Sequence, residues 1–210
     1  MLKIYWADAS AVTEDGTRPL SEYRRRGLET LRHDMARRRA VCVEYLLIEA
    51  IQRENPDFPL PLNIGTDENG KPYLAGRAFE FNLSHSGRYA ACTISDRPLG
   101  LDVQILSQCQ ENLLRRCFTQ EEQDAVLASE DPHGSFTRLW CRKESFLKCT
   151  GHGLRLPLAS FDVSAGFLTD PDGGREYAFA ECRRGELFFC VCTEKTDLPP
   201  DISPQFIALP

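Results

Sequence analysis

The order of apolar patterns along the 210-residue chain is the feature that most limits its fold. A short strand-like segment opens the chain, and apolar residues then recur at helical spacing across residues 29–54. Strands should follow, and the series of strand, helices and strands then begins again near residue 100. We therefore predict an α+β fold made of two similar α+β halves, residues 1–99 and 100–210. The expected strands are 2–8, 78–84, 88–95, 99–105 and, approximately, 160–164, 175–183 and 186–193, with a second helical block at about 110–150 that is broken near 131–132.

Composition excludes several classes of protein. Hydrophobic residues make up 42% of the chain and charged residues 27%, which is ordinary for a globular protein and unlike a disordered one. The N-terminus lacks the basic region and apolar core of a signal peptide, and no apolar run approaches the length of about 20 residues that a membrane helix needs. The nine cysteines include no Cys-x-x-Cys pair, so we expect buried reduced thiols. We expect a cytoplasmic protein that does not bind a membrane.

Positive charge is concentrated near the N-terminus, although the net charge of the chain is −6. A local basic cluster on an acidic protein indicates a site for an anion, and it argues against general affinity for nucleic acid. A solvated, arginine-rich helix face is the alternative. The cluster consists of Arg24, Arg25, Arg26, Arg32, Arg37, Arg38 and Arg39.

Asp102 lies within the predicted strand 99–105, which is apolar on both faces. A carboxylate in such a strand must be paired, bound to a metal or shifted in pKa. Gln104 follows two residues later and shares its face. Two oxygen donors side by side could form half of a site for Mg²⁺, which prefers oxygen ligands. A buried ion pair explains Asp102 equally well.

A Lys-Glu pair interrupts the apolar stripe of the predicted helix that ends at Gly151. Lys143 falls on the centre line of this stripe and Glu144 falls on its border, with Lys148 one turn further on the side of Glu144. Glu144 and Lys148 are also what a solvated helix face can carry. The long stem of Lys143 could bring its charge out to water.

Two other polar segments have local explanations. Ser84 and His85 end an apolar strand, but adjacent strand residues point to opposite faces, so they do not form a nucleophile–base pair. A turn with a hydrogen-bonded imidazole accounts for them. Thr119 and Glu122 have the spacing of a capping box, so capping of a helix explains Glu122 without catalysis.

Together, five segments of this chain resemble the 4′-phosphopantetheinyl transferases. The resemblance is to the pseudodimeric, surfactin-synthetase-activating (Sfp-type) branch, and it spans about residues 20–165. The pattern W-x-x-K-E-S-F-x-K-x-x-G-x-G-L is highly specific, whereas the shorter segments would be weak without it. The segments are "NGKPYL", "FNLSHSG", "GLDVQ", "FTQEE" and "WCRKESFLKCTGHGL".

The resemblance implies a fold and a reaction. It implies two related halves packed as an intramolecular pseudodimer, with the active site in the cleft between them, and hence a monomer. It implies Mg²⁺-dependent transfer of 4′-phosphopantetheine from coenzyme A to a serine of an apo acyl or peptidyl carrier protein, with release of adenosine 3′,5′-bisphosphate. The alternative is a non-catalytic module that binds coenzyme A and a carrier protein. Which carrier protein is used is not implied.

The resemblance also implies the metal ligands and the base. Asp102 and Glu144 match the carboxylates that bind the metal. Gln104 stands where this branch commonly has Glu, so it should bind metal more weakly or through water. Glu144 is the first candidate for the base that accepts the proton of the carrier's serine, and Glu122 is the second.

Other matched residues are expected to hold the phosphates of coenzyme A. His85 and Lys148 match residues that bind phosphate directly. Lys143 and His152 receive no role. The residues expected near the adenosine 3′-phosphate are Lys71 and Pro72 of the GKP segment, Ser84, and Arg39.

Overall fold

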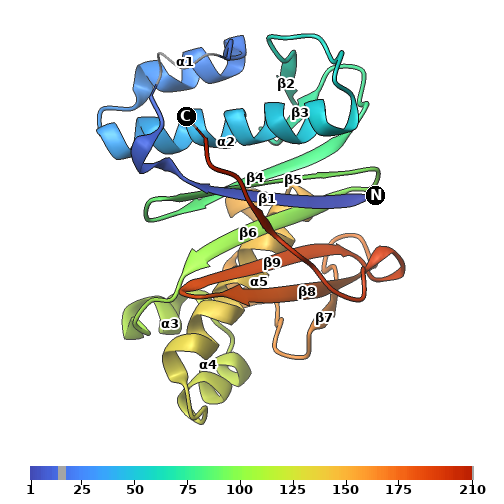
Figure 1. The fold of residues 1–210 in the computed structure, drawn as a ribbon. Coiled ribbons are helices and arrows are strands. Elements are labelled where there is room, and N and C mark those ends of the chain that lie inside the picture. Colours follow the sequence, from blue (N-terminus) through green and yellow to red (C-terminus); the bar gives the residue numbers. More distant parts are fainter. Residues whose placement is uncertain (14–17, 210) are drawn as a thin grey trace. The chain divides into compact units, whose positions relative to one another are not determined.

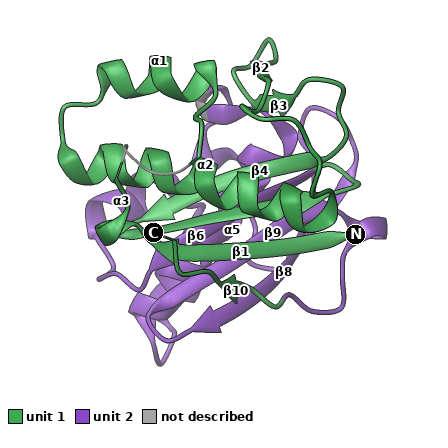
Figure 2. Cartoon of the chain, turned by 45° about the horizontal axis from the view of Figure 1, so that its top comes forward, with its two compact units in different colours: residues 1–98, 203–210 green, residues 99–202 purple. Residues whose placement is uncertain are grey.

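The computed structural model describes residues 1–13 and 18–209, and these form two compact units. Residues 1–98 and 203–210 make up unit 1, and residues 99–202 make up unit 2 (Figure 2). Each unit combines helices with a four-stranded sheet, so the predicted α+β class is confirmed. None of the helices in the described residues has the length and hydropathy needed to cross a bilayer.

Unit 1 places one long helix against its sheet (Figure 1). The strand order in this sheet is β10-β1-β5-β4, in which β10 pairs with β1 in parallel and the other pairs are antiparallel. A separate hairpin consists of β2 and β3. The elements are β1 (Leu2–Asp8), a 3₁₀ turn (Ala9–Ala11), α1 (Glu22–Thr30), α2 (Asp34–Glu54), β2 (Ile64–Thr66), β3 (Pro72–Leu74), β4 (Glu80–Ser86), β5 (Tyr89–Ser95) and β10 (Gln205–Phe206).

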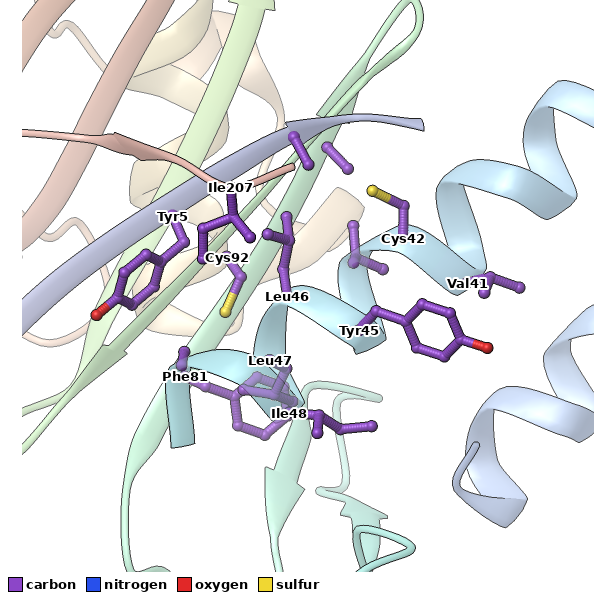
Figure 3. Packing of buried hydrophobic residues seen from close by; sticks show 14 of the residues in the cluster. Tyr5, Val41, Cys42, Tyr45, Leu46, Leu47, Ile48, Phe81, Cys92 and Ile207 are labelled. Atoms are coloured by element: carbon purple, nitrogen blue, oxygen red, sulfur yellow. The ribbon is translucent and has the colours of Figure 1, made fainter. Parts of the chain in front are cut away.

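The core of unit 1 forms where α2 meets the sheet. Val41, Tyr45 and Ile48 recur at helical spacing and are almost completely buried. From the sheet, Phe81 and Cys92 belong to the same cluster (Figure 3). This stripe is the pattern that predicts the helix from the sequence.

The predicted helix at 29–54 is correct at its end and wrong at its start. Helix α2 ends at Glu54, and extended Asn55 precedes Pro56, as the proline requires. At the other end Leu31 is extended, so α1 is a separate helix. The hairpin β2–β3 was also not expected, because its strands are three residues long and carry no clear alternation.

Unit 2 has an antiparallel sheet in the order β6-β9-β8-β7 and one long helix, α5, that contacts β6 and β9. Its C-terminal glycine, Gly151, adopts a left-handed conformation (φ 75°) that ends α5. The elements are β6 (Leu99–Ile105), α3 (Glu111–Cys117), α4 (Gln120–Leu127), α5 (Pro132–Thr150), β7 (Phe167–Thr169), β8 (Glu176–Arg184) and β9 (Leu187–Glu194), with 3₁₀ turns at Gly153–Arg155, Leu158–Ser160 and Lys195–Asp197.

The prediction of a strand at 160–164 is wrong. Phe161 and Val163 are buried, which mimics a strand pattern, but their carbonyl groups accept hydrogen bonds from side chains of α5. The strand that pairs with β8 is instead β7. Side-chain donors can satisfy an irregular buried backbone as well as a neighbouring strand does.

All nine cysteines have free thiols, as predicted, and six are buried, whereas Cys109, Cys117 and Cys182 are partly exposed. Burial raises the pKa of Cys42 to about 12. Burial likewise raises the pKa of Cys92 and Cys190, which are fully enclosed. A thiol with a raised pKa is a poor nucleophile at neutral pH, so these three side chains serve packing.

Candidate functional site

Four of the predicted residues lie together in unit 2, on β6 and α5. Asp102 is 2% exposed, and its two carboxylate oxygens have different partners. Lys148 Nζ lies 2.6 Å from Oδ1, and Gln104 donates its amide Nε2 to Oδ2 at 2.9 Å. Glu144 precedes Lys148 by one helical turn and is partly buried. The arrangement is a small ionic cluster on one strand and one helix.

Gly100 allows β6 to approach the backbone of α5. A Cβ atom at this position would lie 1.9 Å from the carbonyl oxygen of Ser145 and 2.4 Å from the backbone nitrogen of Cys149. Only glycine fits such an approach. Further along β6, Cys141 of α5 donates its thiol to the carbonyl oxygen of Asp102 at 3.3 Å. The strand and the helix are therefore close along the whole stretch that carries the cluster.

The charges of the cluster act on Glu144. Burial raises the pKa of Glu144 above its ordinary value of 4.5, the nearby carboxylate of Asp102 raises it further, and Lys148 lowers it. The charged form of this carboxyl group is thus less favourable here than in water. Residues in this state are common at functional sites.

The cluster fits a magnesium ion. Among the described residues there is no group of three or more His, Cys, Asp or Glu side chains arranged as a metal site. Magnesium is usually held by one or two carboxylates together with substrate phosphates and water, so Asp102 and Glu144 are a sufficient protein contribution. The nitrogen of Gln104 faces Asp102, and a nitrogen donor of this kind is not a ligand for Mg²⁺.

Glu122 is not part of this cluster. Its side chain is 0% exposed and contacts Lys143, whose Nζ lies 2.7 Å from Oε2. The predicted capping box is present, because Thr119 N–H donates to Glu122 and Glu122 N–H donates to the Thr119 hydroxyl. Glu122 also accepts from Val163 N–H at 2.9 Å. A carboxylate so enclosed cannot touch a serine of another protein.

Lys143 forms an ion pair with Glu122, a contact that the sequence alone does not indicate. Besides Glu122, it donates to the carbonyl oxygens of Leu158 at 2.7 Å and Phe161 at 2.6 Å. The side chain is 0% exposed, so its charge does not reach water. Burial lowers the pKa of Lys143, while Glu122 opposes that change.

His152, which receives no role from the sequence, lies beyond the end of α5. Its Nε2 is 3.0 Å from Asp170, and its ring packs against Phe146. Asp170 also accepts from Asp172 N–H within the turn after β7. This histidine connects the helix end to the hairpin of β7 and β8.

The remaining predicted residues belong to unit 1. Ser84 and His85 lie on β4 with Ser84 buried and His85 exposed, as strand alternation predicts. Arg39, on α2, donates to the carbonyl oxygen of Gly87 at 2.8 Å, which places it at the end of the β4–β5 hairpin. Its Nε atom is buried and has no hydrogen-bond partner in the described residues. Lys71 and Pro72 lie at the turn into β3.

Several arginines of the N-terminal cluster form ion pairs or hydrogen bonds within unit 1. Arg24 binds the buried carboxylate of Glu44, and Arg37 donates to the carbonyl oxygens that end α1. A pocket of about 530 Å³ nevertheless lies beside α1, with Arg24 and Arg26 in its wall. The structure is thus compatible with an anion site at the arginine cluster and also with a purely structural role for it.

Comparison with known proteins finds a family whose sequence profile matches the segment that carries the ionic cluster. The sequence profile of the 4′-phosphopantetheinyl transferase superfamily matches residues 98–195, which include Asp102, Glu144 and Lys148. This segment is similar in sequence to the 4′-phosphopantetheinyl transferase superfamily. The predicted resemblance is therefore confirmed for unit 2.

Curated relatives come from the same family. A 4′-phosphopantetheinyl transferase of Bacillus subtilis is 36% identical over 108 residues, or 50% of this chain and 48% of the relative. The 4′-phosphopantetheinyl transferase Sfp of Bacillus subtilis strain 168 is 33% identical over 60% of this chain and 57% of the relative. For the 4′-phosphopantetheinyl transferase psf-1 of Bacillus pumilus, the values are 31%, 66% and 60%. The chain thus spans about half to three fifths of the length of these relatives.

Proposed function

We propose that this protein transfers the 4′-phosphopantetheine group from coenzyme A to a serine of an apo acyl or peptidyl carrier protein. The observation that carries the proposal is the cluster of Asp102, Glu144 and Lys148 on β6 and α5 of a segment similar to the transferase superfamily. The cluster combines two carboxylates for a metal with one cation for a phosphate, which are the groups that phosphoryl transfer needs.

The proposed transfer moves one proton and breaks one bond. Glu144 accepts the proton of the carrier's serine hydroxyl, and the serine oxygen attacks the β-phosphorus of coenzyme A. The bond from this phosphorus to the bridging oxygen breaks, and adenosine 3′,5′-bisphosphate leaves. A raised pKa brings Glu144 closer to neutral pH, which suits a general base.

The other residues of the cluster bind the metal, neutralise phosphate charge or orient a ligand in the proposal. Asp102 and Glu144 hold Mg²⁺, which when bound supplies charge neutralisation at the diphosphate. Lys148, now paired with Asp102, also neutralises phosphate charge. Gln104 orients Asp102 through its amide nitrogen. Glu122 has no chemical role in this proposal, since its side chain is fully enclosed.

The residues of unit 1 are proposed to bind coenzyme A. Arg39 supports this part most directly, because its buried Nε atom has no partner in the described residues and an anion would supply one. Lys71 adds a second cation beside Pro72, and the exposed His85 and buried Ser84 add polar groups. One chain supplies both sets of residues, so we propose a monomer that acts in the cytoplasm, where coenzyme A and apo carrier proteins occur.

Incubation of the protein with coenzyme A, Mg²⁺ and an apo carrier protein is expected to add one phosphopantetheinyl group to the carrier. Intact-mass spectrometry of the carrier measures the transfer, and a panel of fatty-acid, polyketide and peptide carriers identifies the partner. Chelation of Mg²⁺ should stop the transfer, because two carboxylates alone would repel the diphosphate. No mass gain on any carrier, with coenzyme A still bound, would identify a non-catalytic binding module instead.

A further inference from the structure

A fully buried ion pair between Lys143 and Glu122 lies on the side of α5 opposite the sheet. Lys143 projects from α5 and Glu122 from the first turn of α4, and both side chains are 0% exposed. On the other side of α5, Ser145 and Cys149 lie against Gly100 of β6. Glu144 sits between these two faces of the helix.

The pair joins α5 to two other segments of unit 2, α4 and residues 158–161. Lys143 Nζ contacts Glu122 of α4 and the carbonyl oxygens of Leu158 and Phe161. The rings of Phe118 and Phe161 lie 5.6 and 4.4 Å from this ammonium group. The ammonium group is thus surrounded by acceptors whose positions are fixed by other elements.

A buried ion pair of this kind fixes the positions of the elements it joins more than it raises the free energy of unfolding. A buried ion pair must recover a large desolvation cost, and well-packed apolar residues of similar volume often stabilise a protein equally well. Apolar contacts are non-directional, whereas hydrogen bonds to a charged group demand defined distances and angles. The pair therefore restricts how α5 can turn about its axis.

Rotation of α5 matters because of where Glu144 lies. A helix with its side chains has a radius of about 5–6 Å, so a turn of about 20° would move the carboxylate by about 2 Å. A displacement of about 1 Å can cost about 10²-fold in rate. The carboxylates of Glu144 and Asp102 must also stay near each other to share a cation.

We propose that Glu122 and Lys143 are positioning residues that fix the rotation of α5 and so hold Glu144 toward Asp102. This inference rests on the proposed function for the role of Glu144. It assigns the pair neither a proton transfer nor a contact with substrate.

The double variant Glu122→Gln/Lys143→Met tests the inference. It removes both charges, replaces each side chain by an unbranched one of equal length (Gln) or one atom shorter (Met), and leaves one amide oxygen to accept a backbone N–H, so it should stay folded by circular dichroism. We expect kcat for transfer to fall at least tenfold, with KM for coenzyme A within twofold of the wild type. The matched control is Val126→Ala, which removes part of a fully buried side chain of α4 and leaves the pair intact. We expect its kcat to stay within twofold of the wild type at a temperature where it is folded.

Wild-type kcat in the double variant would overturn the inference, as would an equal loss of kcat in Val126→Ala. If the double variant does not fold, Glu122→Asp replaces it. This variant keeps the charge and shortens the reach, so a lower kcat supports the inference and an unchanged kcat overturns it.

Binding of Mn²⁺, measured by water proton relaxation in the presence of coenzyme A, separates this test from that of the proposed function. If the wild type transfers nothing, the proposed function fails and Mn²⁺ binding decides about the pair. At least fivefold weaker Mn²⁺ binding in the double variant supports the positioning role. Unchanged Mn²⁺ binding overturns it.

Discussion

Replacement of Glu144 by glutamine is expected to lower the rate of phosphopantetheinyl transfer by about 10³-fold while the fold is kept. An amide cannot accept the proton of the serine hydroxyl, and it removes one of the two carboxylates proposed to hold Mg²⁺. The measurement is the initial rate of mass gain on an apo carrier protein, with melting followed by circular dichroism.

The same substitution is not expected to destabilise the protein. Burial and Asp102 raise the pKa of Glu144 in the folded state, so its ionised form costs stability at neutral pH. Glutamine removes that cost, and Glu144→Gln should melt at the wild-type temperature or above it. Active sites commonly contain groups that lower the stability of the protein, and Glu144 would be one of them.

Glu121 offers a matched control for this variant. It lies in the first turn of α4 and is exposed, so Glu121→Gln makes the same chemical change away from the cluster. Its transfer rate should stay within twofold of the wild type. Full activity in Glu144→Gln would refute both roles assigned to Glu144 and would leave Asp102 as the remaining carboxylate of the cluster.

The helices of unit 2 could be predicted because their signals are local. Thr119 and Glu122, three residues apart, have the capping-box spacing that marks the start of a helix. Gly151 ends α5 in the left-handed conformation that glycine favours. Asp102 was also recognisable, since a carboxylate in an apolar strand demands a partner. The sequence does not indicate that this partner is Lys148, which is 46 residues away.

The partner of Lys143 could not be predicted, because it depends on contacts between distant segments. A lysine on an apolar stripe has two physical solutions, an exposed amine or a buried acceptor set. The choice is made by Glu122 and by the carbonyl oxygens of 158–161, which meet Lys143 only in the folded unit. The strand wrongly expected at 160–164 has the same cause, since its buried backbone is satisfied by α5.

The C-terminal strand illustrates the same limit in unit 1. Strand β10 is two residues long and pairs with β1, about 200 positions earlier in the chain. A pair of residues has no periodicity to recognise. Nothing in the sequence near Gln205 indicates which edge of which sheet it joins.

Gly100→Ala is expected to destabilise unit 2 by about 3 kcal/mol or more, at or above the upper end of the usual cost of overpacking. The two atoms that a Cβ would meet, at 1.9 and 2.4 Å, belong to the backbone of α5, so no side-chain rotation can make room. Helix and strand would have to separate by about 1.5 Å to reach ordinary contact. The free energy of unfolding, from urea denaturation followed by circular dichroism, measures the effect.

Gly27→Ala provides the control for this prediction. Gly27 is an interior residue of α1, and a Cβ there would meet no atom within 4 Å. Alanine should therefore leave stability unchanged or raise it by about 0.5–1 kcal/mol, the usual gain over glycine in a helix. A Gly100→Ala variant as stable as the wild type would show that α5 can move away from β6 freely. In that case the ionic cluster would not depend on the close approach of the two elements, and transfer by the variant would remain at the wild-type rate.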